Sequence, residues 1–107
     1  MSHEALSRQQ FPPDVYMVHP KEIGYLWSRD WPAYRLRDRP WHAPGSEGHR
    51  EFDERVRDIM ESAKTEGIRE PLVIGQSGQG GYLHQGHHRW EAARRLGIEV
   101  PVRRVGE

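Results

Sequence analysis

The residues of this chain that are best suited to chemistry form one short run, Gly86-His87-His88-Arg89. The run follows the strand-like segment Tyr82-Leu83-His84 and is expected to open a helix that ends at Gly97. A helix N-terminus exposes unpaired backbone N–H groups and carries partial positive charge, so it suits an anion. Gly86 lets the backbone approach a ligand, and the next three side chains add donors. The pattern indicates a phosphate-binding site, and the alternative is a solvent-exposed helix start.

The side chains of this run have distinct candidate roles. The guanidinium fork of Arg89 can hold a phosphate through two hydrogen bonds, whereas a salt bridge to Glu66 or Glu70 is the alternative. His88 can donate to a phosphate oxygen or act as a general acid or base near neutral pH. His87 either joins the site or faces solvent.

A metal site is a competing interpretation of the three histidines at positions 84, 87 and 88. His84 lies on the preceding strand, and no Asp, Glu or Cys pattern completes a ligand set around it. The sequence therefore does not favour a resident metal ion.

This run and its flanks resemble the ParB/sulfiredoxin superfamily. Gly86-His87-His88-Arg89 stands where that family has its G-x-x-R signature, and Val100-Pro101-Val102 matches its last strand. Upstream, Gly67-Ile68-Arg69-Glu70 and the following Pro71-Leu72-Val73-Ile74 resemble the family's G-x-x-Q-P-hydrophobic block. The resemblance covers residues 52–105. It implies an α+β fold, a small mixed β-sheet with packed helices.

The resemblance also implies a ligand and a site. The expected ligand and partner is a nucleotide triphosphate or diphosphate, with or without Mg²⁺, and the expected reaction class is hydrolysis or phosphotransfer. Glu70 stands where the family usually has Gln, so a carboxylate would lie near the nucleotide and hold Mg²⁺ or act as a base. An exposed linker carboxylate is the alternative for Glu70. The candidate catalytic residues are His88 and Glu70, and the candidate nucleotide-binding residues are Gly67, Glu70, Gly86, His87, His88 and Arg89.

Two departures from the family pattern reduce the number of family activities that this chain could have. Sulfiredoxins carry Gly-Cys-His-Arg, but this chain has no cysteine and His87 occupies that position, which excludes thiol-dependent sulfinic-acid reduction. The chain ends at Glu107, shortly after the last expected strand, so the helix-turn-helix domain of chromosome-partitioning ParB is not expected. Gly-His-His-Arg is similar to the serine-kinase branch and to many stand-alone ParB-like domains.

Composition limits the remaining classes. A chain of 107 residues forms one small domain. Its 16 basic residues balance 16 acidic ones, so the overall charge does not favour nucleic acid. No apolar run reaches the length of a signal peptide core or a membrane span, so a cytoplasmic location without a membrane partner is expected.

Periodicity predicts the elements around the site. Residues 1–13 are expected to form a mobile arm, and residues 14–107 a single domain. Strands are expected at 15–18, 71–74, 82–84 and 100–104, with a hairpin turn at 77–81. On the helix after Gly86, Arg94 and Arg95 are expected to point outward. An earlier amphipathic helix is expected to end at Gly67 and to bury one face, formed by Phe52, Val56, Ile59, Met60 and Ala63.

The segment 24–50 has no regular period and alternates aromatic and arginine residues. The favoured interpretation is an ordered loop whose rings cap the core, with arginines stacked on them. The other is a lid or a wall on which a base stacks. Two further functions use this loop or the family analogy: a non-catalytic module that binds DNA or a protein partner, and a ParB-like nuclease. The residues concerned are Trp27, Arg29, Trp31, Tyr34, Arg35, Arg37, Arg39 and Trp41.

Overall fold

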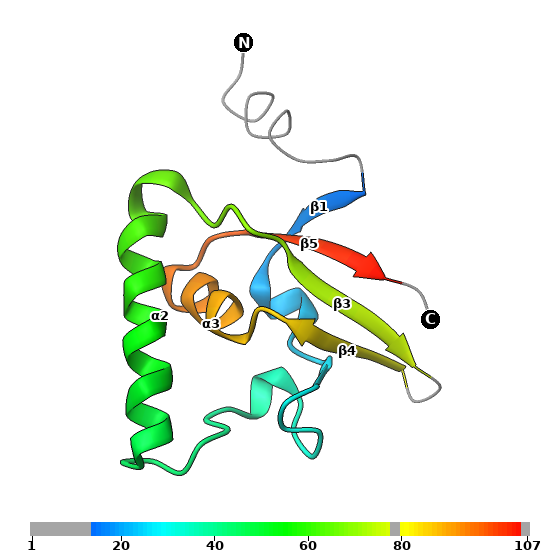
Figure 1. The fold of residues 1–107 in the computed structure, drawn as a ribbon. Coiled ribbons are helices and arrows are strands. Elements are labelled where there is room, and N and C mark those ends of the chain that lie inside the picture. Colours follow the sequence, from blue (N-terminus) through cyan, green and yellow to red (C-terminus); the bar gives the residue numbers. More distant parts are fainter. Residues whose placement is uncertain (1–13, 78–79, 106–107) are drawn as a thin grey trace.

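A five-stranded sheet forms one side of the molecule, and the α-helices lie on the other (Figure 1). The computed structural model describes residues 14–77 and 80–105, and in it two α-helices and two short 3₁₀ helices accompany the sheet (Figure 1). The predicted arm at 1–13 and the tip of the predicted hairpin at 78–79 lie outside the described residues. The strands are β1 (Val15–Val18), β2 (Trp27–Ser28), β3 (Leu72–Ser77), β4 (Gly80–Gln85) and β5 (Val100–Val105).

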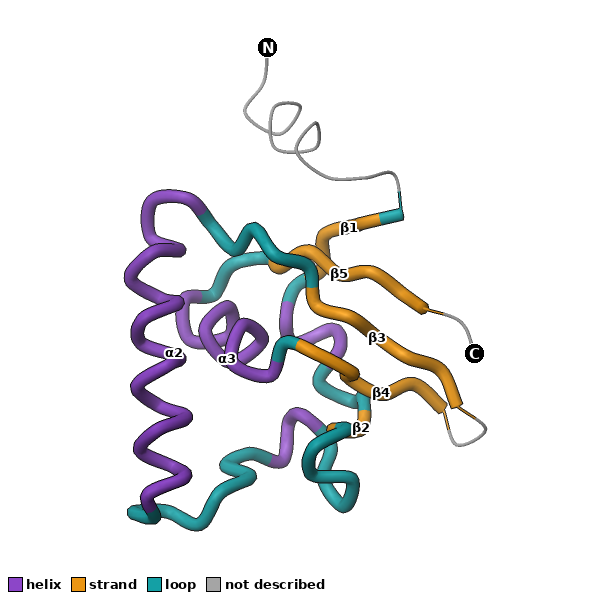
Figure 2. Tube along the Cα trace, in the orientation of Figure 1, coloured by secondary structure: helices purple, strands orange, loops and turns teal. Residues whose placement is uncertain are grey.

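The sheet is mixed, with the strand order β1-β5-β3-β4-β2. β1 runs antiparallel to β5, and β3 runs antiparallel to β4, as a hairpin requires. β5 is parallel to β3, and β2 is parallel to β4 at the far edge (Figure 2). The predicted α+β class, a small mixed sheet with packed helices, is confirmed.

Helix α2 (Glu47–Glu66) is the amphipathic helix predicted from the apolar period. Ser46 begins it, because its Oγ accepts a hydrogen bond from the N–H of His49 at 3.2 Å. Gly67 ends it with a φ of 69°, a conformation that favours glycine. Along the predicted face, Val56 and Ala63 are buried, whereas Phe52, Ile59 and Met60 pack against the core and stay partly exposed.

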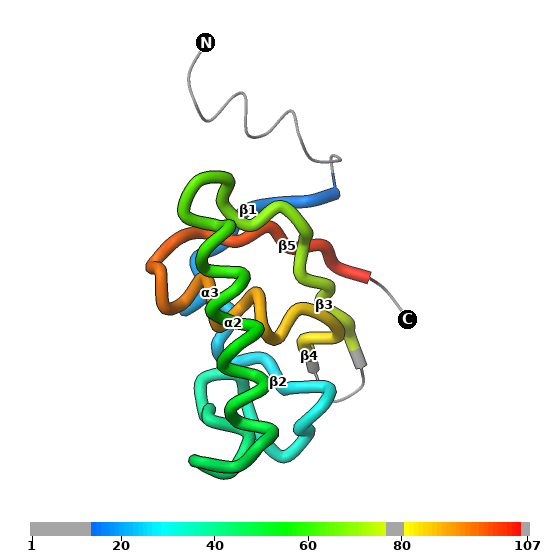
Figure 3. The backbone as a smooth tube through the Cα atoms, turned by 60° about the vertical axis from the view of Figure 1, so that its left-hand side comes forward, coloured from blue at the N-terminus to red at the C-terminus, as the bar shows by residue number. Residues whose placement is uncertain are grey.

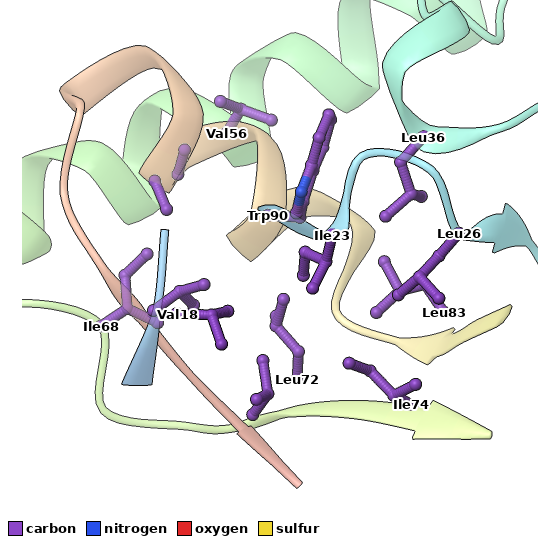
Figure 4. Close-up of a cluster of buried hydrophobic side chains, with 14 of the residues drawn as sticks. Val18, Ile23, Leu26, Leu36, Val56, Ile68, Leu72, Ile74, Leu83 and Trp90 are labelled. Carbon is purple, nitrogen blue, oxygen red and sulfur yellow. The ribbon is translucent and has the colours of Figure 1, made fainter. Parts of the chain in front are cut away.

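Helix α3 (His87–Leu96) lies between α2 and the sheet in Figure 1, and α2 crosses in front of it in the turned view of Figure 3. Its residue Trp90 is fully buried, and the indole N–H donates to the carbonyl of Pro20 at 2.9 Å. Figure 4 shows Trp90 within an apolar cluster that draws side chains from the sheet and from the helices. This packing fixes α3, and with it the residues at its N-terminus.

The segment 24–50 is more regular than its sequence suggests. It contains β2, the 3₁₀ helix η2 (Leu36–Asp38) and the first residues of α2, and it follows the 3₁₀ helix η1 (Pro20–Ile23). Backbone hydrogen bonds hold its turns together, including Leu36 N–H to the carbonyl of Leu26 at 2.9 Å. Leu26 and Leu36 are both buried, so the segment supplies part of the core.

The described part of the chain contains no helix with the length and apolar character needed to cross a bilayer.

Candidate functional site

The first turn of α3 leaves its backbone N–H groups available. Gly86 stands before the helix with a φ of 109°, and a Cβ at this position would collide with the side chain of Leu72, so the backbone conformation and the packing inside the fold both require glycine here. The first helical bond runs from the N–H of Trp90 to the carbonyl of Gly86 at 2.8 Å. Among the described residues, no side chain caps the N–H groups of the first turn. These N–H groups are therefore donors that an anion can use.

His87 is buried directly at the first helical position, with 4% of its surface exposed. Its Nε2 lies 2.8 Å from Oγ of Ser28, which is itself 1% exposed. Ser28 Oγ accepts the N–H of Trp31 at 3.1 Å, so its own proton is best directed to Nε2. The imidazole proton then sits on Nδ1, which faces Oδ2 of Asp30 at 3.6 Å. The solvent-facing alternative for His87 is wrong.

Burial lowers the pKa of the His87 imidazole to about 4, and the neighbouring carboxylate of Asp30 opposes this shift only in part. Trp31 and Trp41 meet the imidazole edge-on, with ring centroids 5.5 and 5.4 Å away. His87 is therefore a neutral group near pH 7, which links the segment around β2 to the start of α3.

His88 is only half-buried and lies nearer to solvent. Its ring stacks on Phe52 of α2, with centroids 4.4 Å apart. Burial lowers the pKa of His88, and the positive charge of Arg55 acts in the same direction. The imidazole is therefore largely neutral near pH 7 and can accept a proton.

Arg89 reaches back to the chain that precedes β3. Its Nη1 donates to the carbonyl of Pro71 at 2.8 Å and to the carbonyl of Glu70 at 3.0 Å. The same nitrogen lies 3.5 Å from the carboxylate of Glu70, whose side chain is 84% exposed. Glu70 is therefore an exposed linker carboxylate, and its contact with Arg89 is the salt bridge considered as the alternative for that arginine. A role of Glu70 towards Mg²⁺ or as a base stays a prediction.

Two adjoining cavities open at this helix start. The first, of about 330 Å³, lies between the β4–α3 junction and residues 29–31. The second, of about 390 Å³, lies between α2 and α3, and the two share Gly86, His88 and Arg89. Together they are lined by Arg29, Asp30, Trp31, Arg55, Asp58, Ile59, His84, Gln85, Gly86, His87, His88 and Arg89.

The structure thus brings four of the predicted site residues together, namely Gly86, His87, His88 and Arg89. Glu70 joins them only through Arg89. Gly67, at the end of α2, lines neither of these two cavities. Its proposed contact with a nucleotide and the catalytic roles of His88 and Glu70 stay predictions.

Sequence reasoning missed Ser28, Asp30 and Arg55. Ser28 reaches His87 because β2 pairs in parallel with β4, which sets Ser28 opposite Leu83. A two-residue strand leaves no periodic signal, so no pattern in the sequence links positions 28 and 87. Arg55 lies on the exposed side of α2, where a charged residue normally indicates only contact with water.

The residues available for a metal ion are few. Over residues 14–77 and 80–105, no group of three or more His, Asp or Glu side chains is arranged to hold one. Mg²⁺ that arrives with a nucleotide needs less, because it usually takes one or two carboxylates together with phosphate oxygens and water. Asp30 and Asp58 line the cavities at the helix start, and Glu70 lies beside Arg89.

Comparison with known proteins identifies the family. The ParB N-terminal domain family matches residues 47–106, more than half of the chain, and the chain therefore belongs to this family. Among solved structures it is similar to sulfiredoxin from Arabidopsis thaliana, with a TM-score of 0.57 and 17% sequence identity. That match covers 89% of this chain and 88% of the sulfiredoxin chain, and it shows the shared fold. No curated protein sequence matches this chain.

Proposed function

We propose that this domain binds a nucleotide triphosphate or diphosphate, with the phosphate groups at the N-terminus of α3. The observation that carries the proposal is the pair of cavities that meet at Gly86, His88 and Arg89, above uncapped N–H groups of the helix. A phosphate at this position would accept those N–H groups and would lie at the positive end of the helix dipole.

The charges around the cavities support an anionic ligand. Three arginines, Arg29, Arg55 and Arg89, line them, against the carboxylates of Asp30 and Asp58. The two histidines are mainly neutral near pH 7, and Glu70 pairs with Arg89, so the side chains are close to charge balance and the positive end of the helix dipole favours an anion. This arrangement fits a short phosphate chain whose charge Mg²⁺ partly neutralises.

Other residues of the site are assigned to the base, to the proton transfer and to Mg²⁺. Trp31 is partly exposed and lines the first cavity, so its ring offers a surface on which a base can stack. In this proposal His88 takes the proton in hydrolysis or phosphotransfer, and its lowered pKa, which leaves a neutral acceptor, supports that role. Glu70, beside Arg89, would bind Mg²⁺ or orient a water molecule.

Arg29→Ala is the variant that tests this proposal. The Arg29 side chain is exposed, lines the first cavity and has no ion pair with another described residue, so its removal should leave the fold intact. We expect nucleotide affinity to fall by about 1–3 kcal/mol, since a charge-assisted hydrogen bond is lost. Isothermal calorimetry with each NTP and NDP, with and without Mg²⁺, measures this.

Arg103→Ala is the matched control for that experiment. Arg103 is an exposed arginine of β5 that lines neither cavity, so the substitution changes the net charge equally. Equal loss in both variants, or no nucleotide binding by the wild-type protein, would reject the proposed site.

Tryptophan fluorescence tests the base-stacking part separately. If a base stacks on Trp31, nucleotide should change the emission, and Trp31→Phe should remove most of the change. Trp27→Phe is the control, because the Trp27 ring is covered by the guanidinium of Arg35 at 4.1 Å and lies outside the cavity lining. A signal that survives Trp31→Phe would place the base elsewhere.

A further inference from the structure

A third cavity, of about 440 Å³, lies between η1, η2 and α3. It shares no lining residue with the two cavities at the start of α3. Four of its lining residues are cations and none is acidic. The lining consists of Lys21, Gly24, Tyr25, Arg37, Arg39, Trp90 and Arg94.

Hydrogen bonds to backbone carbonyls join the three elements that surround this cavity. The N–H of Arg37 donates to the carbonyl of Gly24 at 3.0 Å, which joins η2 to the turn after η1. The indole N–H of Trp90 donates to the carbonyl of Pro20 at 2.9 Å, which joins η1 to α3. Trp90 and Arg94 lie one helical turn apart on α3, so they face the cavity together. The four cations therefore project from elements fixed to one another.

The acidic residues nearest in the chain bind backbone N–H groups outside the cavity. Glu22 is turned to the start of η1, where its Oε1 accepts the N–H of His19 at 3.2 Å. Asp38 accepts the N–H of Arg35 at 3.4 Å at the start of η2. Neither lines the cavity.

Glu91 lies behind the cavity and holds two of its cations in place. Its carboxylate, with 1% of the residue exposed, receives Arg94 at 2.7 and 2.8 Å and Arg39 at 3.0 Å. It also receives Arg95, which pairs with Asp53 as well. One carboxylate therefore faces several guanidiniums. Among the described residues, the side chains of Lys21 and Arg37 form no ion pair, so positive charge is left in excess.

We propose that this cavity is a second ligand site, which binds a small, multiply charged anion through phosphate or carboxylate groups. Arg39 and Arg94, which are paired with Glu91, provide donors in fixed positions. Lys21 and Arg37 contact the ligand from the exposed side of the cavity. The buried ring of Trp90 forms one wall, and the volume lies in the range of small-molecule sites. The site is independent of the proposed nucleotide site.

Pyrophosphate and citrate are the probes, because they carry similar charge on phosphate or on carboxylate groups. Each is titrated into the full chain by calorimetry at constant ionic strength, and the indole N–H resonance of Trp90 is followed by NMR. We expect saturable binding of at least one probe and a shift of the Trp90 resonance. The probe that binds more tightly identifies the group that the site prefers.

The double variant Lys21→Ala/Arg37→Ala tests the location without disturbing the buried Glu91 cluster. Losing two charge-assisted contacts should weaken binding by about tenfold or more. The control Arg50→Ala/Arg103→Ala removes two exposed arginines outside this cavity and should change affinity by less than about twofold. Arg29→Ala should also leave the affinity unchanged, which separates this site from the nucleotide site.

Three results would overturn the proposal. They are the absence of saturable binding by either probe, equal weakening in the two double variants, and loss of binding in Arg29→Ala alone. The last result would assign the anion to the start of α3.

Discussion

A single buried histidine connects the segment around β2 to the proposed ligand site. His87 is buried and accepts a hydrogen bond from Ser28, so protonation would place a charge in a site built for the neutral ring. Its pKa is lowered from 6.5 to about 4. Because the unfolded chain binds the proton more readily, the folded state keeps full stability above about pH 6.5 and loses it progressively as the pH falls towards about 4.

We therefore predict that the free energy of unfolding falls by about 2 kcal/mol between pH 7 and pH 5 because of His87. Urea denaturation at several pH values measures it, and His87→Gln should flatten the profile in this range. His49→Gln is the matched control, because it makes the same substitution at another histidine, in the first turn of α2. The same steepness in His87→Gln and the wild-type protein would assign the pH dependence to other groups.

The buried carboxylate of Glu91 gives a second prediction at this scale. Burial by itself would raise the pKa of Glu91, but hydrogen bonds from Arg94 and Arg95 and the charge of Arg39 outweigh it and lower the pKa. Glu91→Gln removes the charge and leaves Arg39 and Arg94 partly buried without a carboxylate partner, whereas Arg95 keeps its pair with Asp53. We expect it to cost about 3–5 kcal/mol of stability.

Glu61→Gln is the matched comparison for Glu91→Gln in urea denaturation. It breaks an exposed pair with Lys64 on α2 and should cost less than about 1 kcal/mol. Similar costs for the two variants would mean that the Glu91 cluster adds little to stability.

At the scale of elements, the junction between β4 and α3 depends on glycine. Gly86→Ala imposes a φ of 109° on a residue with a Cβ and drives that Cβ into Leu72. We expect a cost of about 2–4 kcal/mol from strain and displaced packing together. Gly97→Ala has a positive φ of 68° but no atom within 4 Å of the added Cβ, so it should cost only about 1–2 kcal/mol. Equal losses in thermal unfolding would show that Leu72 moves aside freely.

The elements that the sequence predicted are those with a regular period or a sharp stop. The apolar spacing from Phe52 to Ala63 predicted α2, and glycines at 67 and 97 predicted the ends of both α-helices. Ile59 illustrates the limit, since periodicity places it within the stripe while the structure leaves it beside an open cavity. A period predicts which side of a helix faces inward, whereas tertiary packing determines how much of that side is covered.

Other features depend on tertiary contacts that no local pattern records. Glu91 is a charged residue on the buried side of α3, and it is tolerated there because Arg39 arrives from the segment before α2. Arg94 and Arg95, predicted to point outward, turn to the same carboxylate. The run at 86–89 was found from the sequence because helix starts have local rules. Ser28 was not, because its partner His87 is 59 positions away.

At the scale of the whole molecule, the balanced composition separates the nucleotide proposal from the alternative of a DNA-binding module. The chain has 16 basic and 16 acidic residues, and several arginines are paired with carboxylates. Three arginines line the cavities at the start of α3, and this number is enough to bind one short phosphate chain. A DNA surface would need a longer track of unpaired cations.

Salt dependence is therefore the final prediction. Nucleotide affinity should fall gently between 50 and 200 mM salt, with a log–log slope of about −1 to −2, because few ionic contacts form. Duplex DNA, followed by fluorescence anisotropy in the same buffers, should bind no more tightly than about 10⁻⁴ M at physiological salt, the weak end of non-specific binding. Arg29→Ala should weaken the nucleotide and leave the DNA signal unchanged. Tight DNA binding with a slope near −5, insensitive to nucleotide, would instead favour a nucleic-acid-binding module and separate that activity from the cavities at the start of α3.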